Sequence, residues 1–272
     1  MLDFQQDQAA GLRRIMAGPK PRILSLLSAS HHEVQAKIIS NLASTLHRQG
    51  GDVLVVHAGE DSPETMKQYD LQNLHSLMEK AIDNFNCHAI KTSSHGFAVS
   101  RLLPKNQLIR HYSEDELHSL NSLFTSMAKH HEIVLVDSVL TANNTLPLDS
   151  LNQGEIVIHL NQKPESIKQA YSLIKMICSE LGRRPFSILI NEANAKTAQT
   201  VFNNINQVAR RFMHVELEYI GFIPVDDHLG RAARLGRSVV DAFPMASASQ
   251  AFKELASKID YRHSMQSSVQ SL

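Results

Sequence analysis

Short apolar, β-branched runs alternate with longer segments of helical periodicity along most of the chain. Three of the runs, Arg22–Ser28, Val53–His57 and Ile133–Asp137, are almost continuously apolar, as strands buried on both faces are. Further strands are predicted at Glu155–Leu160, Ser187–Asn191 and Glu218–Ile223, and helices at Val34–Gln49, Ser113–His130, Pro164–Leu181, Lys196–Arg211 and Ser247–Lys258. This alternation predicts an α/β fold, a mostly parallel, doubly wound sheet with helices on both faces.

The pattern predicts one folded domain with a segment outside it at each end. Residues 1–20 form a polar, helix-prone arm that ends in the breaker-rich stretch Gly18-Pro19-Lys20-Pro21. Residues 21–260 carry the alternating strands and helices without a repeat or a low-complexity linker. Residues 261–272 are rich in Ser and Gln, and we expect them to be a flexible tail.

Composition narrows the functional classes. Lys plus Arg and Asp plus Glu are equal at 27 each, so there is no global charge to attract nucleic acid or an acidic membrane. No apolar run approaches the roughly 20 residues that span a bilayer, and no signal peptide precedes the first strand. The two cysteines match no metal or redox spacing. We therefore expect a cytoplasmic protein that does not bind nucleic acid.

The turn between the first strand and the first helix is where an α/β protein would hold a phosphate. It reads SASHHEVQAK from Ser28 to Lys37. Its flanks, Ile23–Ser28 and Ser40-Asn41-Leu42-Ala43, resemble the first strand and helix of the MinD/ParA superfamily. They are most similar to its FlhG/FleN branch, the regulators of flagellar number and position. The resemblance implies the fold of a MinD-like P-loop NTPase.

The phosphate-binding motif of that family, S-G-K-G-G-V-G-K-T, aligns from Ser28 to Ala36 without a gap, and only its first Ser is kept. A P-loop needs glycines for close backbone approach, a Lys for phosphate charge and a hydroxyl for Mg²⁺. In this chain Ser30 replaces the signature Lys, His31, His32 and Val34 replace glycines, Gln35 replaces the P-loop Lys, and Ala36 replaces the Mg²⁺-binding Thr.

Two further motifs show which catalytic parts are kept. The family ends its second strand with D-A-D, whose aspartates serve the attacking water and the metal, but this chain has His57-Ala58-Gly59. Asp137 is kept at the Walker-B position, and Asn191 at a position that helps to recognise adenine in the family. Because their partner residues are replaced, we interpret Asp137 and Asn191 as structural remnants. The sequence thus predicts an inactive ATPase homologue with no catalytic residue, to which ATP and Mg²⁺ do not bind tightly.

The adjacent histidines raise the alternative of a metal site. His31, His32 and His57 all lie near strand carboxyl ends, but neighbouring loop residues point apart and no ligand spacing is met. We favour solvent-facing imidazoles in a disused pocket and predict no metal site.

The N-terminal arm is the motif that predicts a partner. Asp7-Gln8-Ala9-Ala10-Gly11-Leu12-Arg13 matches the D-Q-A-x-x-L-R arm of the FlhG branch. In that family the arm docks on the flagellar signal-recognition-type GTPase, FlhF, and stimulates GTP hydrolysis. Its expected contacts would come from Asp7, Gln8, Ala9, Leu12 and Arg13. The alternative is an ordinary amphipathic helix that packs on its own domain.

The second half of the chain extends the family resemblance. Lys163-Pro164-Glu165-Ser166, Tyr219–Asp227 and Ser238–Pro244 follow one another in the family's order and spacing. The last twelve residues contain few large apolar groups and one Arg, so they do not predict the amphipathic membrane helix of some relatives. Stable membrane binding is therefore not expected.

Taken together, the residues predict a nucleotide-independent regulator of flagellar number, placement or gene expression that acts through protein binding. A flagellar transcription regulator or a basal-body protein is a further candidate partner, and such partners would recruit it to the cell pole or flagellar base. The first alternative is a divergent MinD-like ATP-binding switch, which Asp137 and Asn191 favour. The second is ParA-like nonspecific DNA binding through Arg210-Arg211, Arg231, Arg234 and Arg237.

Overall fold

The computed structural model describes the chain except for residues 1–19, 31, 60–73, 75–90, 105–108 and 270–272, and it describes only the backbone of 32, 33, 91 and 261–269. Within these limits the chain forms one sheet of eight strands in the order β3-β4-β2-β5-β1-β6-β7-β8. The strands are β1 (Arg22–Ser28), β2 (Val53–His57), β3 (Lys91–Thr92), β4 (Ala98–Arg101), β5 (Ile133–Asp137), β6 (Glu155–Leu160), β7 (Phe186–Asn191) and β8 (Leu217–Ile223).

The sheet is parallel except at one edge, where β3 pairs with β4 in antiparallel fashion. The predicted α/β class and the mostly parallel sheet are therefore confirmed. The order β2-β5-β1-β6 places β1 in the middle, so the turn that follows β1 opens at the centre of the sheet's carboxyl edge.

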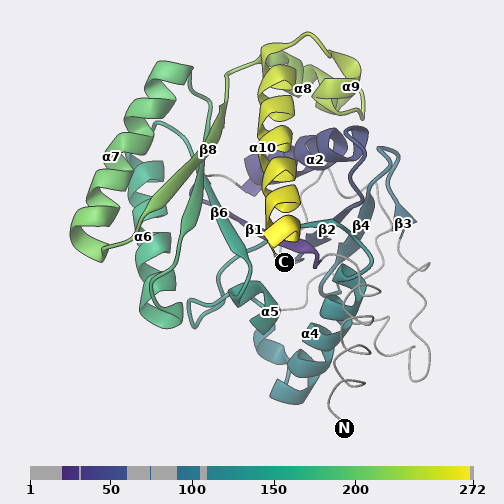
Figure 1. The fold of residues 1–272 in the computed structure, drawn as a ribbon, viewed down its shortest axis with the longest axis vertical. Helices are drawn as coiled ribbons and strands as arrows, with labels where there is room; N and C mark the ends of the chain where they lie inside the picture. Colours follow the sequence, from purple (N-terminus) through teal and green to yellow (C-terminus); the bar gives the residue numbers. More distant parts are fainter. Residues whose placement is uncertain (1–19, 31, 60–73, 75–90, 105–108, 270–272) are drawn as a thin grey trace, which may run out of the picture.

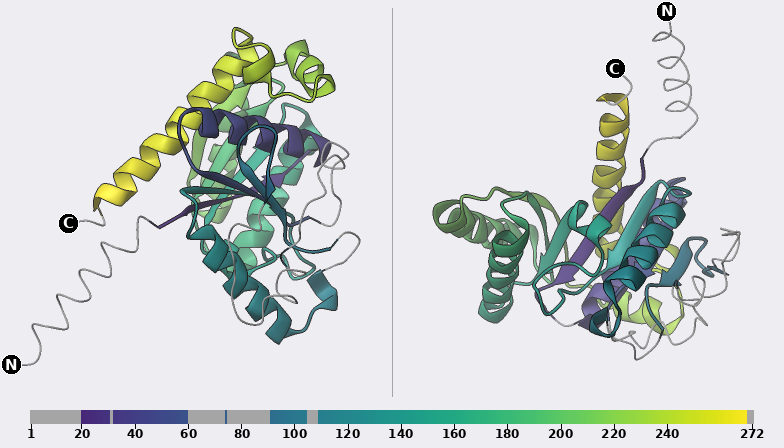
Figure 2. Two further views of the ribbon diagram at one scale, coloured as in Figure 1. Left: turned by 90° about the vertical axis from the view of Figure 1, so that its right-hand side faces the viewer. Right: turned by 90° about the horizontal axis from the view of Figure 1, so that it is seen from below.

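Helices cover both faces of the sheet (Figures 1 and 2). One face packs on α4 (Glu114–Ala128), α5 (Asp149–Asn152), α6 (Pro164–Leu181) and α7 (Ala195–Met213). The other packs on α2 (His32–Arg48), α8 (Asp227–Arg234), α9 (Val239–Ala242) and α10 (Ser247–Val269). Neighbouring residues of one strand serve opposite cores: Val55 lies in the α2 core and Val56 in the α4 core. This explains why the strands are apolar without alternation.

Local sequence signals account for the helix ends. Ser113 caps α4 in a capping box with Glu116, as the sequence predicts. Pro164 occupies the first turn of α6. A short 3₁₀ turn, η3 (Ile109–His111), precedes α4.

Two sequence predictions differ from the structure. Strands β3 and β4 were not predicted, because Lys91–Thr92 and Ala98–Arg101 are too short and too mixed in composition to show a period. The last helix was expected to end at Lys258, but the backbone of α10 stays helical to Val269. The helix therefore continues into the segment expected to be a tail, because Ser and Gln still allow a helix to continue once it has been started by a packed segment.

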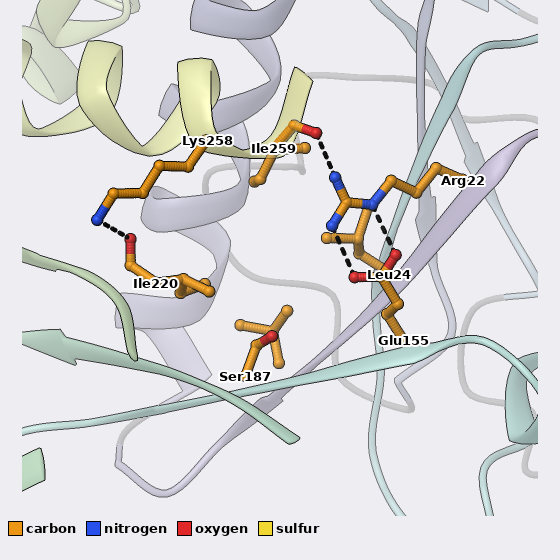
Figure 3. Close-up of a pocket in the computed structure, with 8 residues that line it drawn as sticks. Arg22, Leu24, Glu155, Ser187, Ile220, Lys258 and Ile259 are labelled. Carbon is orange, nitrogen blue, oxygen red and sulfur yellow. Dashed lines mark hydrogen bonds and ion pairs between the residues drawn. The ribbon is translucent and has the colours of Figure 1, made fainter. Parts of the chain in front are cut away.

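A buried arginine fixes the middle of α10 to the sheet (Figure 3). Arg22, at the start of β1, donates from Nε and Nη2 to the two carboxylate oxygens of Glu155 at 2.6 and 2.7 Å. Its Nη1 donates to the carbonyl oxygen of Ile259 in α10. The guanidinium of Arg22 thus joins β1, β6 and α10. In the sequence, Arg22 comes just after the arm, residues 1–20.

Candidate functional site

The candidate site lies where β1, β2 and β5 end, at the start of α2. Opposite residues of adjacent parallel strands project to the same face of a sheet. The register places His57 of β2 opposite Asp137 of β5, and Asp137 opposite Leu26 of β1. The face that they share is the one covered by α2, and Gln35 in the first turn of α2 lies over it.

Gln35, His57 and Asp137 form one buried hydrogen-bonded cluster. Gln35 Nε2 donates to Asp137 Oδ1 and, at 3.0 Å, to the carbonyl oxygen of Leu26. His57 Nδ1 lies 2.8 Å from Asp137 Oδ2. The exposed fractions of Gln35, His57 and Asp137 are 0, 2 and 4%. Both oxygens of the buried carboxyl group are therefore engaged by neighbouring side chains.

By the resemblance described above, Gln35 stands at the P-loop Lys position, His57 at the first Asp of D-A-D and Asp137 at the Walker-B position. The cluster therefore joins two substituted positions to one that is kept. The amide of Gln35 points into the protein toward Asp137 and the Leu26 carbonyl. It is therefore directed away from the position where a loop-bound phosphate would require a cation.

The turn before α2 is closed by its own side chains. Ser28 Oγ donates to the Ser30 carbonyl oxygen at 2.9 Å, and the Ser30 N–H donates back to Ser28 Oγ at 3.0 Å. The Ala29 N–H donates to the His159 carbonyl oxygen at 2.9 Å. Two backbone N–H groups of this turn are thus used within the protein, whereas a phosphate-binding loop presents such groups to its ligand.

Other predicted residues of the degenerate site have separate positions. Ala36 is buried at 1% exposure inside α2, and Val34 packs on the core beside it. Gly59 is half-buried, and a Cβ there would meet only Val139 Cγ1 at an ordinary 3.6 Å, so its backbone does not require glycine. His31 lies outside the described residues, and of His32 only the helical backbone is described.

Asn191 ends β7 and is not part of the Asp137 cluster. It is 2% exposed, and its Oδ1 lies 3.4 Å from His159 Nδ1. Its Nδ2 is buried without a hydrogen-bond partner among the residues that the structure describes. The amide is therefore turned toward the interior and not offered to a base at the surface.

One expectation about the histidines is wrong. His57 was interpreted as a solvent-facing imidazole in a disused pocket, but it is buried and bonded to Asp137. No local pattern indicates this pairing, because 80 residues separate the two side chains. The signal that could have found it is positional: each residue ends a predicted apolar strand, and the carboxyl ends of neighbouring parallel strands lie side by side.

The side chains present do not fit a bound Mg²⁺-nucleotide. Both Asp137 oxygens are engaged by Gln35 and His57, and Ala36 offers no metal-binding oxygen. Among the described residues, no group of three or more His, Cys, Asp or Glu side chains is placed to hold a metal ion. The arm residues Asp7, Gln8, Ala9, Leu12 and Arg13 lie outside the described residues.

Comparison with solved structures defines the class to which this fold belongs. A ParA family ATPase from Chlorobium tepidum matches with a TM-score of 0.65 at 16% identity, covering 87% of this chain and 97% of that one. MinD from Aquifex aeolicus matches with a TM-score of 0.63 at 16% identity, covering 88% and 96%. The chain has the fold of the MinD/ParA ATPases.

Sequence comparison finds a curated relative of partial coverage. The antiactivator FleN of Pseudomonas aeruginosa is 30% identical over 155 residues, which are 57% of this chain and 55% of the relative. The chain is thus similar in sequence to a FleN protein and shares its fold with the MinD/ParA ATPases. It spans about half the length of the curated relatives that it matches. No family model matches the sequence.

None of the described helices combines the length and the apolar character needed to cross a membrane.

Proposed function

We propose that this protein is a nucleotide-independent regulator of flagellar number, placement or flagellar gene expression that acts through protein–protein binding. The similarity to an antiactivator, FleN, supports a regulatory role. The observation that carries the nucleotide-independent part is the buried cluster of Gln35, His57 and Asp137. The cluster uses the Lys and Asp positions of an ATPase for internal hydrogen bonds.

A nucleotide-dependent switch needs a part of the protein that the nucleotide can move. In an ATPase of this kind, loop and strand ends change their contacts when a phosphate arrives or leaves. Here the ends of β2 and β5 and the first turn of α2 are joined by buried hydrogen bonds, so opening the cluster would expose a carboxylate that has lost its donors. The site would then keep one conformation. The concentration of a partner protein, and not ATP hydrolysis, would set the regulatory activity.

The direct test is isothermal titration of the full chain with ATP·Mg²⁺ and with ADP·Mg²⁺. The proposal expects no saturable heat from either nucleotide. Saturable binding would support the alternative, a divergent MinD-like ATP-binding switch whose loop holds phosphate in another way. The retained Asp137 is the observation that keeps this alternative in view.

For the partner, we propose that the arm, residues 1–20, docks on a flagellar signal-recognition-type GTPase of the FlhF kind. Leu12 would enter an apolar groove, Arg13 would pair with a carboxylate or phosphate, and Gln8 would hydrogen-bond near the GTPase site. The matched test compares the full chain with a variant that lacks residues 1–20 and with Leu12→Ala and Arg13→Ala. Equal binding by all four proteins would refute arm docking without touching the nucleotide proposal.

A further inference from the structure

Arg101, the last residue of β4, is a buried arginine without a counterion. It is 8% exposed, and its Nε has no hydrogen-bond partner in the part of the chain that the structure describes. No carboxylate of the described residues forms an ion pair with it. Arg22 shows how this protein otherwise satisfies a buried guanidinium, because both oxygens of Glu155 and the Ile259 carbonyl accept from it.

The burial of Arg101 is unfavourable without an anion. Taking a cation out of water costs free energy that only an opposite charge or good hydrogen-bond acceptors can offset. The same desolvation lowers the pKa of Arg101 from its ordinary value. An anion bound beside the guanidinium would remove this penalty.

Arg101 lies next to His57 at the carboxyl edge of the sheet. Strand β4 pairs in parallel with β2, and the register sets Arg101 opposite His57. Opposite residues of adjacent parallel strands project to the same face of a sheet, which here is the face of the α2 core, where Val99 and Val55 also pack. The carboxyl edge is where open α/β sheets hold their ligands.

His57 has one ring nitrogen that is not used. Its Nδ1 is bonded to Asp137 on β5, whereas its Nε2 is buried with no hydrogen-bond partner among the described residues. The two nitrogens of an imidazole point in divergent directions, so Nε2 is turned away from Asp137. Strands β5 and β4 lie on opposite sides of β2. Two buried polar groups without partners therefore occupy adjacent register positions of β2 and β4.

We propose that Arg101 and His57 bind a small oxyanion of the phosphate class at the carboxyl ends of β4 and β2. The forked N–H groups of a guanidinium match two oxygens of a phosphate. A protonated phosphate oxygen can also donate to His57 Nε2 when the ring proton is on Nδ1. An ionised carboxylate has no such hydroxyl, so phosphate or a phosphomonoester fits the pair of side chains better.

This oxyanion site is separate from the turn that corresponds to the nucleotide loop. Strands β2 and β5 lie between β4 and β1, after which that turn comes. The site does not depend on the proposed function. ATP·Mg²⁺ binding that persists in Arg101→Met would contradict nucleotide independence and leave the oxyanion site untouched, so the two proposals can fail separately.

Titration calorimetry of the full chain with sodium phosphate, in a phosphate-free buffer at constant ionic strength, tests the proposal. We expect saturable binding at one site per chain. Arg101→Met should weaken it on the order of ten-fold or more, because the paired donors are lost. Arg48→Met, at an exposed arginine, is the matched control and should bind phosphate as the wild type does. No saturable heat for the wild type, or equal affinity in Arg101→Met, overturns the proposal.

Two further anions define the ligand. Sulfate carries no proton at neutral pH and should bind more weakly than phosphate, because it cannot donate to His57 Nε2. Sulfate binding as tight as that of phosphate would overturn the assignment to the phosphate class. Glycerol 3-phosphate separates the two sources of the same chemistry: tighter binding than that of phosphate indicates a phosphomonoester, and weaker binding indicates the free anion.

Thermal unfolding separates a binding role of Arg101 from a structural one. Phosphate should raise the unfolding temperature of the wild type and of Arg48→Met, but not that of Arg101→Met. In phosphate-free buffer Arg101→Met should unfold no earlier than the wild type, because the substitution removes a buried charge that has no partner. A lower unfolding temperature for Arg101→Met in that buffer would mean that the guanidinium already has a partner within the protein, and would overturn the proposal.

Discussion

The amide of Gln35 donates a hydrogen bond to the carboxylate of Asp137 across 102 residues of sequence, deep below the turn that should bind phosphate. His57 supplies the second donor to the same carboxylate at 2.8 Å. Gln35 and His57, the residues that the family resemblance places at the P-loop Lys and at the first Asp of D-A-D, are thus both partners of one buried acid. This contact agrees with the interpretation of Asp137 as a structural residue, and the effect of its loss on stability can be measured.

Removing Asp137 should destabilise the nucleotide-free protein. Asp137→Ala leaves the buried donors of Gln35 and His57 without their acceptor, and we expect a loss of about 2–4 kcal/mol in the free energy of unfolding. Urea denaturation measures it, with Asp149→Ala at an exposed position as the control. A change below about 0.5 kcal/mol, the size typical of surface substitutions, would contradict a structural role.

Restoring a single P-loop residue should not restore nucleotide binding. In Gln35→Lys the introduced ammonium would lie against Asp137, while the loop would still lack glycines and the metal-binding hydroxyl. Titration calorimetry with ATP·Mg²⁺ should show no saturable heat for Gln35→Lys or for Gln35→Lys/Ala36→Thr. Binding by the single variant would mean that the loop has kept a phosphate-binding geometry despite its side chains.

Asp226 should make stability depend on pH in the acid range. Burial alone would raise its pKa, but hydrogen bonds from the N–H groups of Ala248 and His228 and from the Ser247 and His228 side chains hold the pKa well below its usual range. The folded-state pKa is lower than the unfolded value of about 3.9. This contribution is therefore complete above that value and is lost as pH falls through and below it.

Asp226→Asn should consequently flatten the acid side of the stability profile and cost roughly 1–3 kcal/mol at neutral pH, because the carboxylate accepts from backbone N–H groups at the starts of α8 and α10. Thermal or urea unfolding between neutral pH and pH ~3 measures both effects. Asp227→Asn, one residue on and exposed, is the matched control. Parallel acid limbs for wild type and Asp226→Asn would refute the assignment.

Two arginine–carboxylate pairs should differ in their contribution to stability. Arg22 has a side chain 3% exposed and binds Glu155 and the Ile259 carbonyl, whereas Arg48 is 56% exposed where it pairs with Asp241. Arg22→Met should cost about 2–4 kcal/mol, because it removes the hydrogen bonds that join α10 to β1 and β6.

Arg48→Met should cost less than about 1 kcal/mol, since solvent screens that pair. Arg22→Lys keeps the charge but not the forked donors, and we expect an intermediate loss. Urea denaturation of the three variants checks the ranking. Equal losses for Arg22→Met and Arg48→Met would contradict it.

The sequence alone determined the strands that form the centre of the sheet. Runs such as Val53–His57 and Ile133–Asp137 are apolar on both faces, and only a strand covered on both sides satisfies that pattern. Pro164 and the Ser113 capping box likewise fixed helix starts, because those signals act within one turn. The sequence also predicts a degenerate phosphate-binding loop from Ser30 to Ala36, because that prediction depends only on which side chains are present.

Only the tertiary structure decided what the substituted residues do. Gln35, His57 and Asp137 come from three separate elements, and their contact exists because β2, β5 and β1 are neighbours in the sheet though not in the chain. The same holds for Asp226, which meets the start of α10 across 22 residues. Local patterns fix elements because their forces act over a few residues, whereas partners of buried polar groups are set by the order in which the elements pack.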